Sequence, residues 1–288
     1  MMELKDLTST YTLANGIAIP AVGYGTFRTP ATVARQAVKT AIEVGYRHID
    51  TAAVYENEEA VGQGIKDSGI DRDSIFLTSK LWNTERGYDK TIAAFEASLK
   101  RLKTTYLDLY LIHWPANQKQ FGDQAAALNA ETWRALEDLY KQRKVKAIGL
   151  SNFMPHHVAE LLKTAKIRPQ VDQIEVHPGW THQEEIKKLQ AMGILVEAWA
   201  PLGGQGATVM ENETIKQIAT AHGKTPAQVV LRWEIQQEVL PLPKSVHEHR
   251  MRENADVFDF TLSPAEMGKI AALPNMGGQC ADPDEVDY

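Results

Sequence analysis

Eight short apolar runs alternate with helical patterns along this chain. The patterns between the runs repeat apolar residues at three- and four-residue steps, as Phe95, Leu99 and Leu102 do. Apolar strands that alternate with amphipathic helices indicate a parallel sheet covered on its outer face, and eight such units favour a closed barrel. We therefore predict an α/β fold, a (β/α)8 TIM barrel. Its strands should lie at 21–25, 46–51, 75–80, 107–113, 147–152, 171–177, 195–201 and 239–244.

Turn and capping signals add detail to this barrel. Asn15 and Gly16 stand between two short apolar runs, which predicts a β-hairpin before the first barrel strand. Capping boxes with proline at the first helical position predict helices that begin after Thr225 and Ser263. Residues 115–130 lack strong periodicity and are predicted to form a long loop, and the tail from Pro274 is predicted to be irregular. No linker interrupts the pattern, so we expect one domain over 1–288.

Composition excludes several classes of protein. The net charge of -6 disfavours a general nucleic-acid surface, which needs clustered positive charge. No apolar run approaches the roughly 20 residues of a membrane helix, and residues 1–6 lack the basic and apolar segments of a secretion signal. We expect a cytoplasmic protein that is a monomer. Cys280 is the only cysteine, which rules out an internal disulfide and a Cys-rich metal site; we expect it to be incidental.

Ionisable side chains stand at the carboxyl ends of successive predicted strands. Asp50, Lys80 and His113 each end an apolar run, and Tyr55 follows the second strand closely. Such residues converge on the mouth of a parallel barrel, where barrel enzymes keep their active sites. A neighbouring ammonium lowers the pKa of a phenol, and a carboxylate keeps a buried lysine charged. Together with a histidine that orients the substrate oxygen, the group suits proton delivery to a carbonyl, with hydride coming from a nicotinamide.

These residues belong to an ordered set of motifs by which the sequence resembles the aldo-keto reductases. The likeness covers roughly residues 12–273 and is closest to the bacterial branch of 2,5-diketo-gluconate reductases and general aldehyde reductases. It implies an NADPH-dependent oxidoreductase that acts on CH-OH groups, with Asp50, Tyr55, Lys80 and His113 as its catalytic tetrad. The motifs are Gly25-Thr26, Asp50-Thr51-Ala52 with Tyr55 and Glu59, Ser79-Lys80-Leu81-Trp82, His113-Trp114-Pro115, Gly149-Leu150-Ser151-Asn152-Phe153, Gln173 with Glu175 and His177-Pro178, and Pro243-Lys244-Ser245.

The resemblance also implies how NADPH/NADP+ is bound. Ser151, Asn152 and Gln173 would hold the carboxamide, and Trp199 would stack on the nicotinamide ring. Lys244, Ser245 and Arg250 suit a 2'-phosphate, because arginine offers a planar fork and lysine a point charge. The complete predicted cofactor site is Gly25, Thr26, Asp50, Ser151, Asn152, Gln173, Trp199, Pro201, Leu202, Lys244, Ser245, Val246, Arg250, Glu253 and Asn254.

The predicted substrate is a small carbonyl compound. Tyr24, Trp82 and Trp114 are expected to form an apolar wall, with Tyr55 and His113 beside the carbonyl. The residues do not rank sugar ketones, methylglyoxal, aromatic aldehydes or steroids.

Other interpretations remain at this stage. Arg28 replaces the third glycine that a dinucleotide fingerprint starting at Gly23 would need, which disfavours a Rossmann domain. The histidine pairs 156–157 and 247–249 lack a supporting metal-ligand pattern, so no metal is expected. A Schiff-base aldolase could use Lys80 but would leave Tyr55 without a role. The remaining alternative is a nicotinamide-binding redox sensor with low turnover, which activity measurements would distinguish.

Overall fold

The computed structural model describes residues 4–288, so residues 1–3 of the predicted domain and chain start lie outside the described part. Eight parallel strands form one sheet in which each strand pairs with its neighbour in the chain. The backbone N–H groups of Gly23 and Gly25 donate to the carbonyls of Pro241 and Pro243, which joins the first strand to the last. The strands are β3 (Tyr24–Gly25), β4 (His48–Asp50), β5 (Phe76–Leu81), β6 (Leu107–Ile112), β7 (Val145–Ser151), β8 (Val171–Glu175), β9 (Leu195–Trp199) and β10 (Val239–Pro241).

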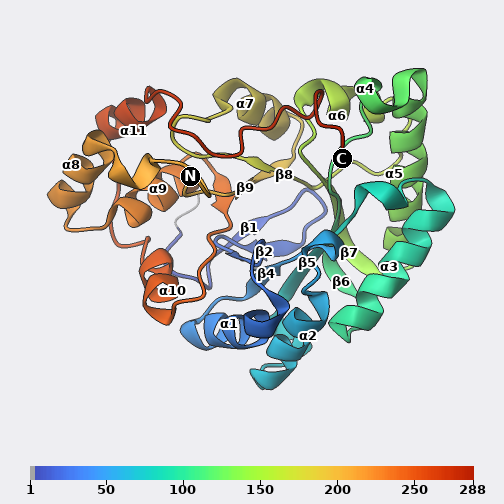
Figure 1. Cartoon of the computed structure of the whole chain (residues 1–288), viewed down its shortest axis with the longest axis horizontal. Helices are drawn as coiled ribbons and strands as arrows, with labels where there is room; N and C mark the ends of the chain where they lie inside the picture. The colour runs from blue at the N-terminus through green and yellow to red at the C-terminus, as the bar shows by residue number, and fades with distance from the viewer. Residues whose placement is uncertain (1–3) are drawn as a thin grey trace.

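Helices surround this sheet on its outer side (Figure 1). They are α1 (Ala31–Val44), α2 (Glu58–Asp67), α3 (Tyr88–Leu102), α4 (Gln118–Phe121), α5 (Ala125–Lys141), α6 (Pro155–Leu161), α7 (Gln183–Ala191), α8 (Glu213–His222), α9 (Pro226–Ile235), α10 (Glu248–Ala255) and α11 (Pro264–Ala271). The predicted (β/α)8 fold is thereby confirmed. Within residues 4–288, no helix combines the length and the apolar character that crossing a membrane requires.

Two layers of apolar side chains follow from the alternation of residues along each strand. In β6, Leu109 and Leu111 face the barrel interior, whereas Tyr110 and Ile112 pack toward the helices. Successive strand residues are buried on both sides, which explains why the strand sequences read as continuous apolar runs. The barrel interior is therefore a packed core, and reactive groups can be accommodated only at the ends of the strands.

The predicted hairpin precedes the barrel. Strands β1 (Thr10–Thr12) and β2 (Ala18–Pro20) pair antiparallel, with Tyr11 opposite Ile19. Gly16 has a φ of 83° in the turn between them, a backbone conformation that glycine adopts at little cost. Tyr11 and Ile19 belong to the apolar cluster of the barrel interior, so the hairpin buries part of that cluster.

The capping predictions are confirmed, but the predicted long loop is partly wrong. The hydroxyls of Thr225 and Ser263 accept hydrogen bonds from the third residue of α9 and α11. Within 115–130, however, α4 and a 3-10 turn at Gly122–Gln124 lead directly into α5, which begins at Ala125. The start of α5 is rich in alanine, the strongest helix former, but Leu128 is its only large apolar residue, too few to make a periodic pattern visible.

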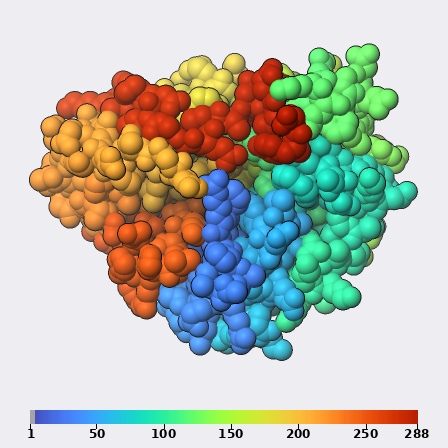
Figure 2. All heavy atoms as spheres, in the orientation of Figure 1, coloured from blue at the N-terminus to red at the C-terminus, as the bar shows by residue number. Residues whose placement is uncertain are grey.

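The C-terminal segment, residues 272–288, contains no helix or strand, as predicted for the tail. It crosses the face of the molecule shown in Figures 1 and 2, where it is coloured red. Asn117 anchors it, because its side-chain amide donates to the carbonyls of Pro283 and Val286 at 2.9 and 2.8 Å. Residues that follow β6 and the end of the chain are thus held together over one rim of the barrel.

Candidate active site

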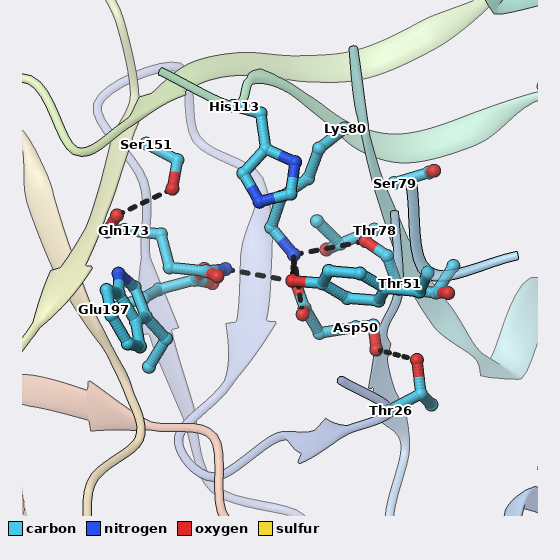
Figure 3. A network of polar contacts seen from close by, with 12 residues as sticks. Thr26, Asp50, Thr51, Thr78, Ser79, Lys80, His113, Ser151, Gln173 and Glu197 are labelled. Atoms are coloured by element: carbon cyan, nitrogen blue, oxygen red, sulfur yellow. Dashed lines mark hydrogen bonds and ion pairs between the residues drawn. The ribbon is translucent and has the colours of Figure 1, made fainter. Parts of the chain in front are cut away.

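The predicted tetrad comes from three neighbouring strands and the turn after one of them. Asp50 is the last residue of β4, Lys80 lies in β5, and His113 immediately follows β6. Tyr55 ends a 3-10 turn at Ala53–Tyr55. Because parallel strands end on the same side of the sheet, Asp50, Lys80 and His113 meet at the carboxyl face of the barrel (Figure 3). The Tyr55 hydroxyl lies within hydrogen-bond distance of Lys80.

Lys80 is the centre of this group. Its Nζ donates to both carboxylate oxygens of Asp50 at 2.7 and 2.8 Å, to the carbonyl of Thr51 at 3.0 Å and to the Tyr55 hydroxyl at 3.3 Å. The Lys80 side chain has no exposed surface. A buried ammonium needs a charged partner, and Asp50 supplies it with two short hydrogen bonds.

The ionisation of Lys80 and Tyr55 reflects both burial and charge. Burial opposes the charge on Lys80, but attraction to Asp50 and Tyr55 outweighs it and raises the lysine pKa. Burial raises the pKa of the Tyr55 phenol above its ordinary value, and the Lys80 charge offsets this only in part. The Lys80 ammonium does lower the pKa of Tyr55, as predicted, but burial outweighs it and the net direction is upward. Tyr55 is consequently protonated at neutral pH.

His113 completes the group with a neutral ring. Its ring centroid lies 5.7 Å from that of Tyr55 and 5.3 Å from that of Trp82, in edge-to-face geometry. Burial, followed by the charge of Lys80, holds the His113 pKa well below its usual range. The amide of Asn152 donates to the His113 carbonyl at 2.9 Å and fixes the backbone there. A neutral imidazole can donate a hydrogen bond without placing a second cation beside Lys80.

A row of polar side chains continues around the strand ends. Ser151 ends β7 and donates from Oγ to the carbonyl of Gln173 in β8 at 2.8 Å. Asn152 has a φ of 62°, a left-handed conformation that asparagine tolerates better than most residues. Its amide oxygen accepts from Nε1 of Trp199, the last residue of β9, at 2.8 Å. The residues predicted to hold the carboxamide and the ring of the nicotinamide therefore form one hydrogen-bonded unit.

Gln173 links this row to the tetrad. Its Nε2 donates to Asp50 at 2.9 Å and to Glu197 at 2.8 Å. Burial, and then the charge of Asp50, raise the pKa of Glu197 to about 8. Glu197 is thus protonated at neutral pH, which avoids two carboxylate charges on one amide.

The polar groups line the floor of a cavity of about 710 Å³, within the range of small-molecule sites. Thirteen predicted site residues line it: Gly25, Asp50, Tyr55, Trp82, His113, Trp114, Ser151, Asn152, Gln173, Trp199, Pro201, Leu202 and Lys244. Other residues of its wall were not predicted: Phe27, Arg28, Val54, Glu175, Gln205, Gln279 and Tyr288 among them. Glu175 ends β8 just as Asp50 ends β4, a signal that could have identified it; the remaining residues lie on loops without such a signal.

Tyr24 does not line the cavity, contrary to expectation. Neighbouring strand residues point to opposite sides, so with Gly25 in the cavity wall Tyr24 packs outward against Tyr46. Its hydroxyl donates to the Ser245 carbonyl at 2.6 Å. Tyr24 therefore supports the segment that follows β10. Thr26 is also buried behind the site, where its hydroxyl donates to the Asp50 carbonyl at 2.9 Å.

The remaining predicted cofactor residues lie on or near α10. Arg250 and Val246 are exposed, and the Lys244 and Arg250 side chains make no hydrogen bond or ion pair with any residue in 4–288. Glu253 accepts from the Thr225 hydroxyl at 2.7 Å, and Asn254 is buried. Two unpaired cations therefore stand beside the cavity rim and the start of α10.

Comparison with known proteins adds an independent observation. The model of the aldo/keto reductase family matches residues 21–275. The chain belongs to the aldo/keto reductase family. This aldo/keto reductase is 50% identical to glyoxal reductase of Bacillus subtilis (strain 168), in an alignment that covers 99% of this chain and 98% of the relative.

Solved structures of the family share its fold. An aldo-keto reductase from a Medee basin deep-sea metagenome library is 44% identical, with a TM-score of 0.91 and coverage of 97% of this chain and 100% of that one. The Bombyx mori aldo-keto reductase, solved in complex with NADP, is 36% identical, with a TM-score of 0.85 and coverage of 91% and 92%. Nicotinamide dinucleotides are therefore ligands of structural relatives of this reductase.

Proposed function

We propose that this aldo/keto reductase uses NADPH to reduce aldehydes and ketones to alcohols, with Tyr55 as the proton donor. The observation that carries the proposal is the single ammonium of Lys80, bonded at once to Asp50 and to the Tyr55 hydroxyl on the cavity floor. A phenol held in this way can release its proton to a substrate oxygen, because Lys80 stabilises the phenolate that forms.

The protonation states suit this direction of reaction. The raised pKa keeps Tyr55 protonated before the reaction, as a proton donor must be. Asp50 keeps Lys80 charged, so a positive charge is already in place when negative charge develops on the phenol. His113 is neutral and its ring lies against that of Tyr55, where an N–H could orient the carbonyl oxygen of a substrate.

The residues around the cavity fit a nicotinamide dinucleotide phosphate. Bound there, this cofactor would supply the hydride that the carbonyl carbon accepts. Ser151, Asn152 and Gln173 offer hydrogen bonds to a carboxamide, and Trp199 offers a flat apolar surface beside them. Lys244 lines the cavity and has no partner among residues 4–288, so its charge is free for a phosphate. These features support NADPH as the cofactor, with Arg250 as a second phosphate ligand.

The substrate class follows from the wall of the cavity. Trp82, Trp114 and Phe27 surround the polar floor, which suits a small carbonyl compound with an apolar or extended remainder. The name of the Bacillus relative points to glyoxal as the substrate of that protein, and we propose small reactive aldehydes of this kind for this chain.

The proposal is tested by following the absorbance of NADPH with methylglyoxal, a nitrobenzaldehyde and 2,5-diketo-gluconate. Wild type should oxidise NADPH with at least one of them, and Tyr55→Phe should reduce kcat by about 10²- to 10⁴-fold, the usual contribution of a general acid. NADPH binding, measured by quenching of tryptophan fluorescence, should persist in the variant. If wild type binds NADPH yet turns over no faster than Tyr55→Phe, the redox-sensor interpretation replaces the enzyme.

A further inference from the structure

A second cluster of reactive side chains lies beside the cavity but outside the tetrad. Glu175 ends β8, His177 follows two residues later, and Cys280 belongs to the C-terminal segment. Their ligand atoms, one from each residue, all lie within 4.8 Å of one another. Glu175 and His177 are buried, and Cys280 is half-buried. Cys280 was predicted to be incidental, and no sequence pattern links it to His177.

The backbone of the C-terminal segment approaches this cluster closely at Gly278. An added Cβ there would lie 2.7 Å from Nε2 of His177 and 3.1 Å from a carboxylate oxygen of Glu175. Gly278 also has a φ of 125°, a conformation that favours glycine. A side chain at this position would therefore press on both ligand atoms.

The hydrogen bonding of His177 sets the state of its ring. Nδ1 lies 3.0 Å from the carbonyl oxygen of Pro178, and only an N–H can make that hydrogen bond. A neutral ring therefore presents a lone pair at Nε2, which lies 3.3 Å from Oε1 of Glu175. Two lone pairs facing each other repel. A cation held between these two atoms would be attracted by both of them.

Hydrogen bonds within the chain account for only part of the cluster. Oε1 of Glu175 accepts from the Gln279 N–H at 2.9 Å, but Oε2 of this buried side chain has no hydrogen-bond partner in the described chain. The Cys280 sulfur makes only long contacts, at 3.7 Å from Nδ2 of Asn275 and 3.8 Å from the Gly277 carbonyl oxygen. A metal ion would use the imidazole, the thiol and the carboxylate together.

We propose that Glu175, His177 and Cys280 bind a divalent metal ion of the zinc type. Nitrogen, sulfur and carboxylate oxygen are the donors that zinc takes in proteins. The Pro178 carbonyl accepts from Nδ1 of His177 and so orients the ring with Nε2 toward the metal, as the partners of metal-binding histidines commonly do. Ligands of one tetrahedral zinc lie about 3.3–3.8 Å apart, given its usual bond lengths. The His177–Glu175 separation already has this value, and a small shift of the C-terminal segment brings in the sulfur. Water would take the fourth position, and the thiol proton would pass to solvent.

A second cluster, of His156, His157 and Asp284, differs from this one in its hydrogen bonding. The backbone N–H of Met154 donates to Nδ1 of His157, which leaves the ring proton on Nε2. That Nε2 faces a carboxylate oxygen of Asp284 at 2.9 Å, an ordinary N–H to oxygen hydrogen bond. This arrangement is satisfied without an ion. His156, exposed beside it, therefore provides a matched control.

Cobalt(II) gives a direct test on the full chain after treatment with a chelator. Cys280 is the only cysteine, so a thiolate-to-cobalt charge-transfer absorption can come from this site alone. We expect that absorption, with the strong visible bands of tetrahedral cobalt, and its loss when zinc is added. Cys280→Ser should abolish the charge-transfer band, and Cys280→Ser and His177→Gln should each weaken zinc binding at least tenfold. His156→Gln should change neither.

Thermal unfolding provides the second measurement, because an ion at this site fastens the C-terminal segment to β8. Zinc should raise the Tm of wild type and of His156→Gln, but not that of Cys280→Ser. Circular dichroism checks that each variant is folded. If a variant is not folded, the charge-transfer band of wild type with cobalt still tests whether Cys280 binds the metal. Absence of the charge-transfer band, or equal zinc affinity in wild type, Cys280→Ser and His177→Gln, would overturn the proposal. None of these readouts depends on reductase activity.

Discussion

The ammonium nitrogen of Lys80 lies 3.3 Å from the phenolic oxygen of Tyr55. The same nitrogen is bonded to both oxygens of Asp50, and the lysine is completely buried. The charge of Lys80 therefore acts within this group and is hardly screened by water. The stability of the protein depends on the balance of charge between Lys80 and Asp50, whereas turnover depends on the charge of Lys80 beside Tyr55. Variants can therefore separate the two effects.

Lys80→Met should destabilise the protein and abolish turnover. The variant leaves Asp50 buried without its cation, and breaking a buried pair on one side costs about 3–5 kcal/mol in the free energy of unfolding. Adding Asp50→Asn should recover most of that stability, because the uncompensated charge is gone, while kcat stays near background. Urea unfolding and NADPH oxidation measure the two quantities. If Lys80→Met alone is as stable as wild type, the buried Asp50–Lys80 pair does not have the role in stability described here.

Glu197 should make stability depend on pH. A glutamate in the unfolded chain ionises near its ordinary pKa of 4.5, whereas in the folded protein the value is about 8. Between these values the folded state binds more protons, so the free energy of unfolding falls as pH rises. Glu197→Gln should flatten this fall when urea unfolding is compared at about pH 5 and about pH 8. The exposed Glu248→Gln should keep the wild-type slope.

Lys244 and Arg250 should determine the preference for NADPH over NADH. A hydrogen bond to a charged group contributes about 1.5–3 kcal/mol, which corresponds to roughly 10- to 150-fold in binding. Lys244→Met or Arg250→Met should raise KM for NADPH by about this factor and leave KM for NADH nearly unchanged. Lys269→Met, an exposed charge on α11, serves as the control. Equal effects on both cofactors would exclude a 2'-phosphate contact.

Tyr288 should restrict which substrates enter the cavity. Its ring is stacked at 6.1 Å from Trp82 and lies edge-on at 5.3 Å from Trp114. Tyr288→Ala should widen this part of the cavity and raise kcat/KM for a nitrobenzaldehyde relative to methylglyoxal. Tyr288→Phe keeps the ring and should keep the wild-type ratio. A ratio that is the same in all three proteins would show that the ring does not limit access.

The sequence predicted the barrel and the meeting of its strand ends, because both follow from local patterns. Asp50, Lys80 and His113 each end an apolar run, and parallel strands bring such ends to one face. Contacts that join distant segments carry no such pattern. Nothing in the residues near Asn117 indicates that its side chain binds the carbonyls of Pro283 and Val286.

The other differences between the predictions and the structure also have physical causes. Alanine makes a helix without making a visible apolar stripe, so the start of α5 at Ala125 was missed. Tyr24 was assigned to the cavity as an aromatic near the tetrad, but strand alternation turns it toward Tyr46. The direction of the Tyr55 pKa depends on how strongly burial competes with charge, which requires coordinates. The monomeric state, the cytoplasmic location and the single domain over 1–288 stay predictions.

The contacts that join β3 to β10 have a consequence for biosynthesis. Gly23 and Gly25 form hydrogen bonds with Pro241 and Pro243, and Tyr24 forms one with Ser245. The first barrel strand therefore pairs with residues that are synthesised near the end of the chain. The ribosome adds about 5–20 residues per second to a growing chain. A nascent chain therefore spends more than ten seconds with β3 unpaired on this side. The barrel therefore cannot close until β10 and the residues that follow it have been made.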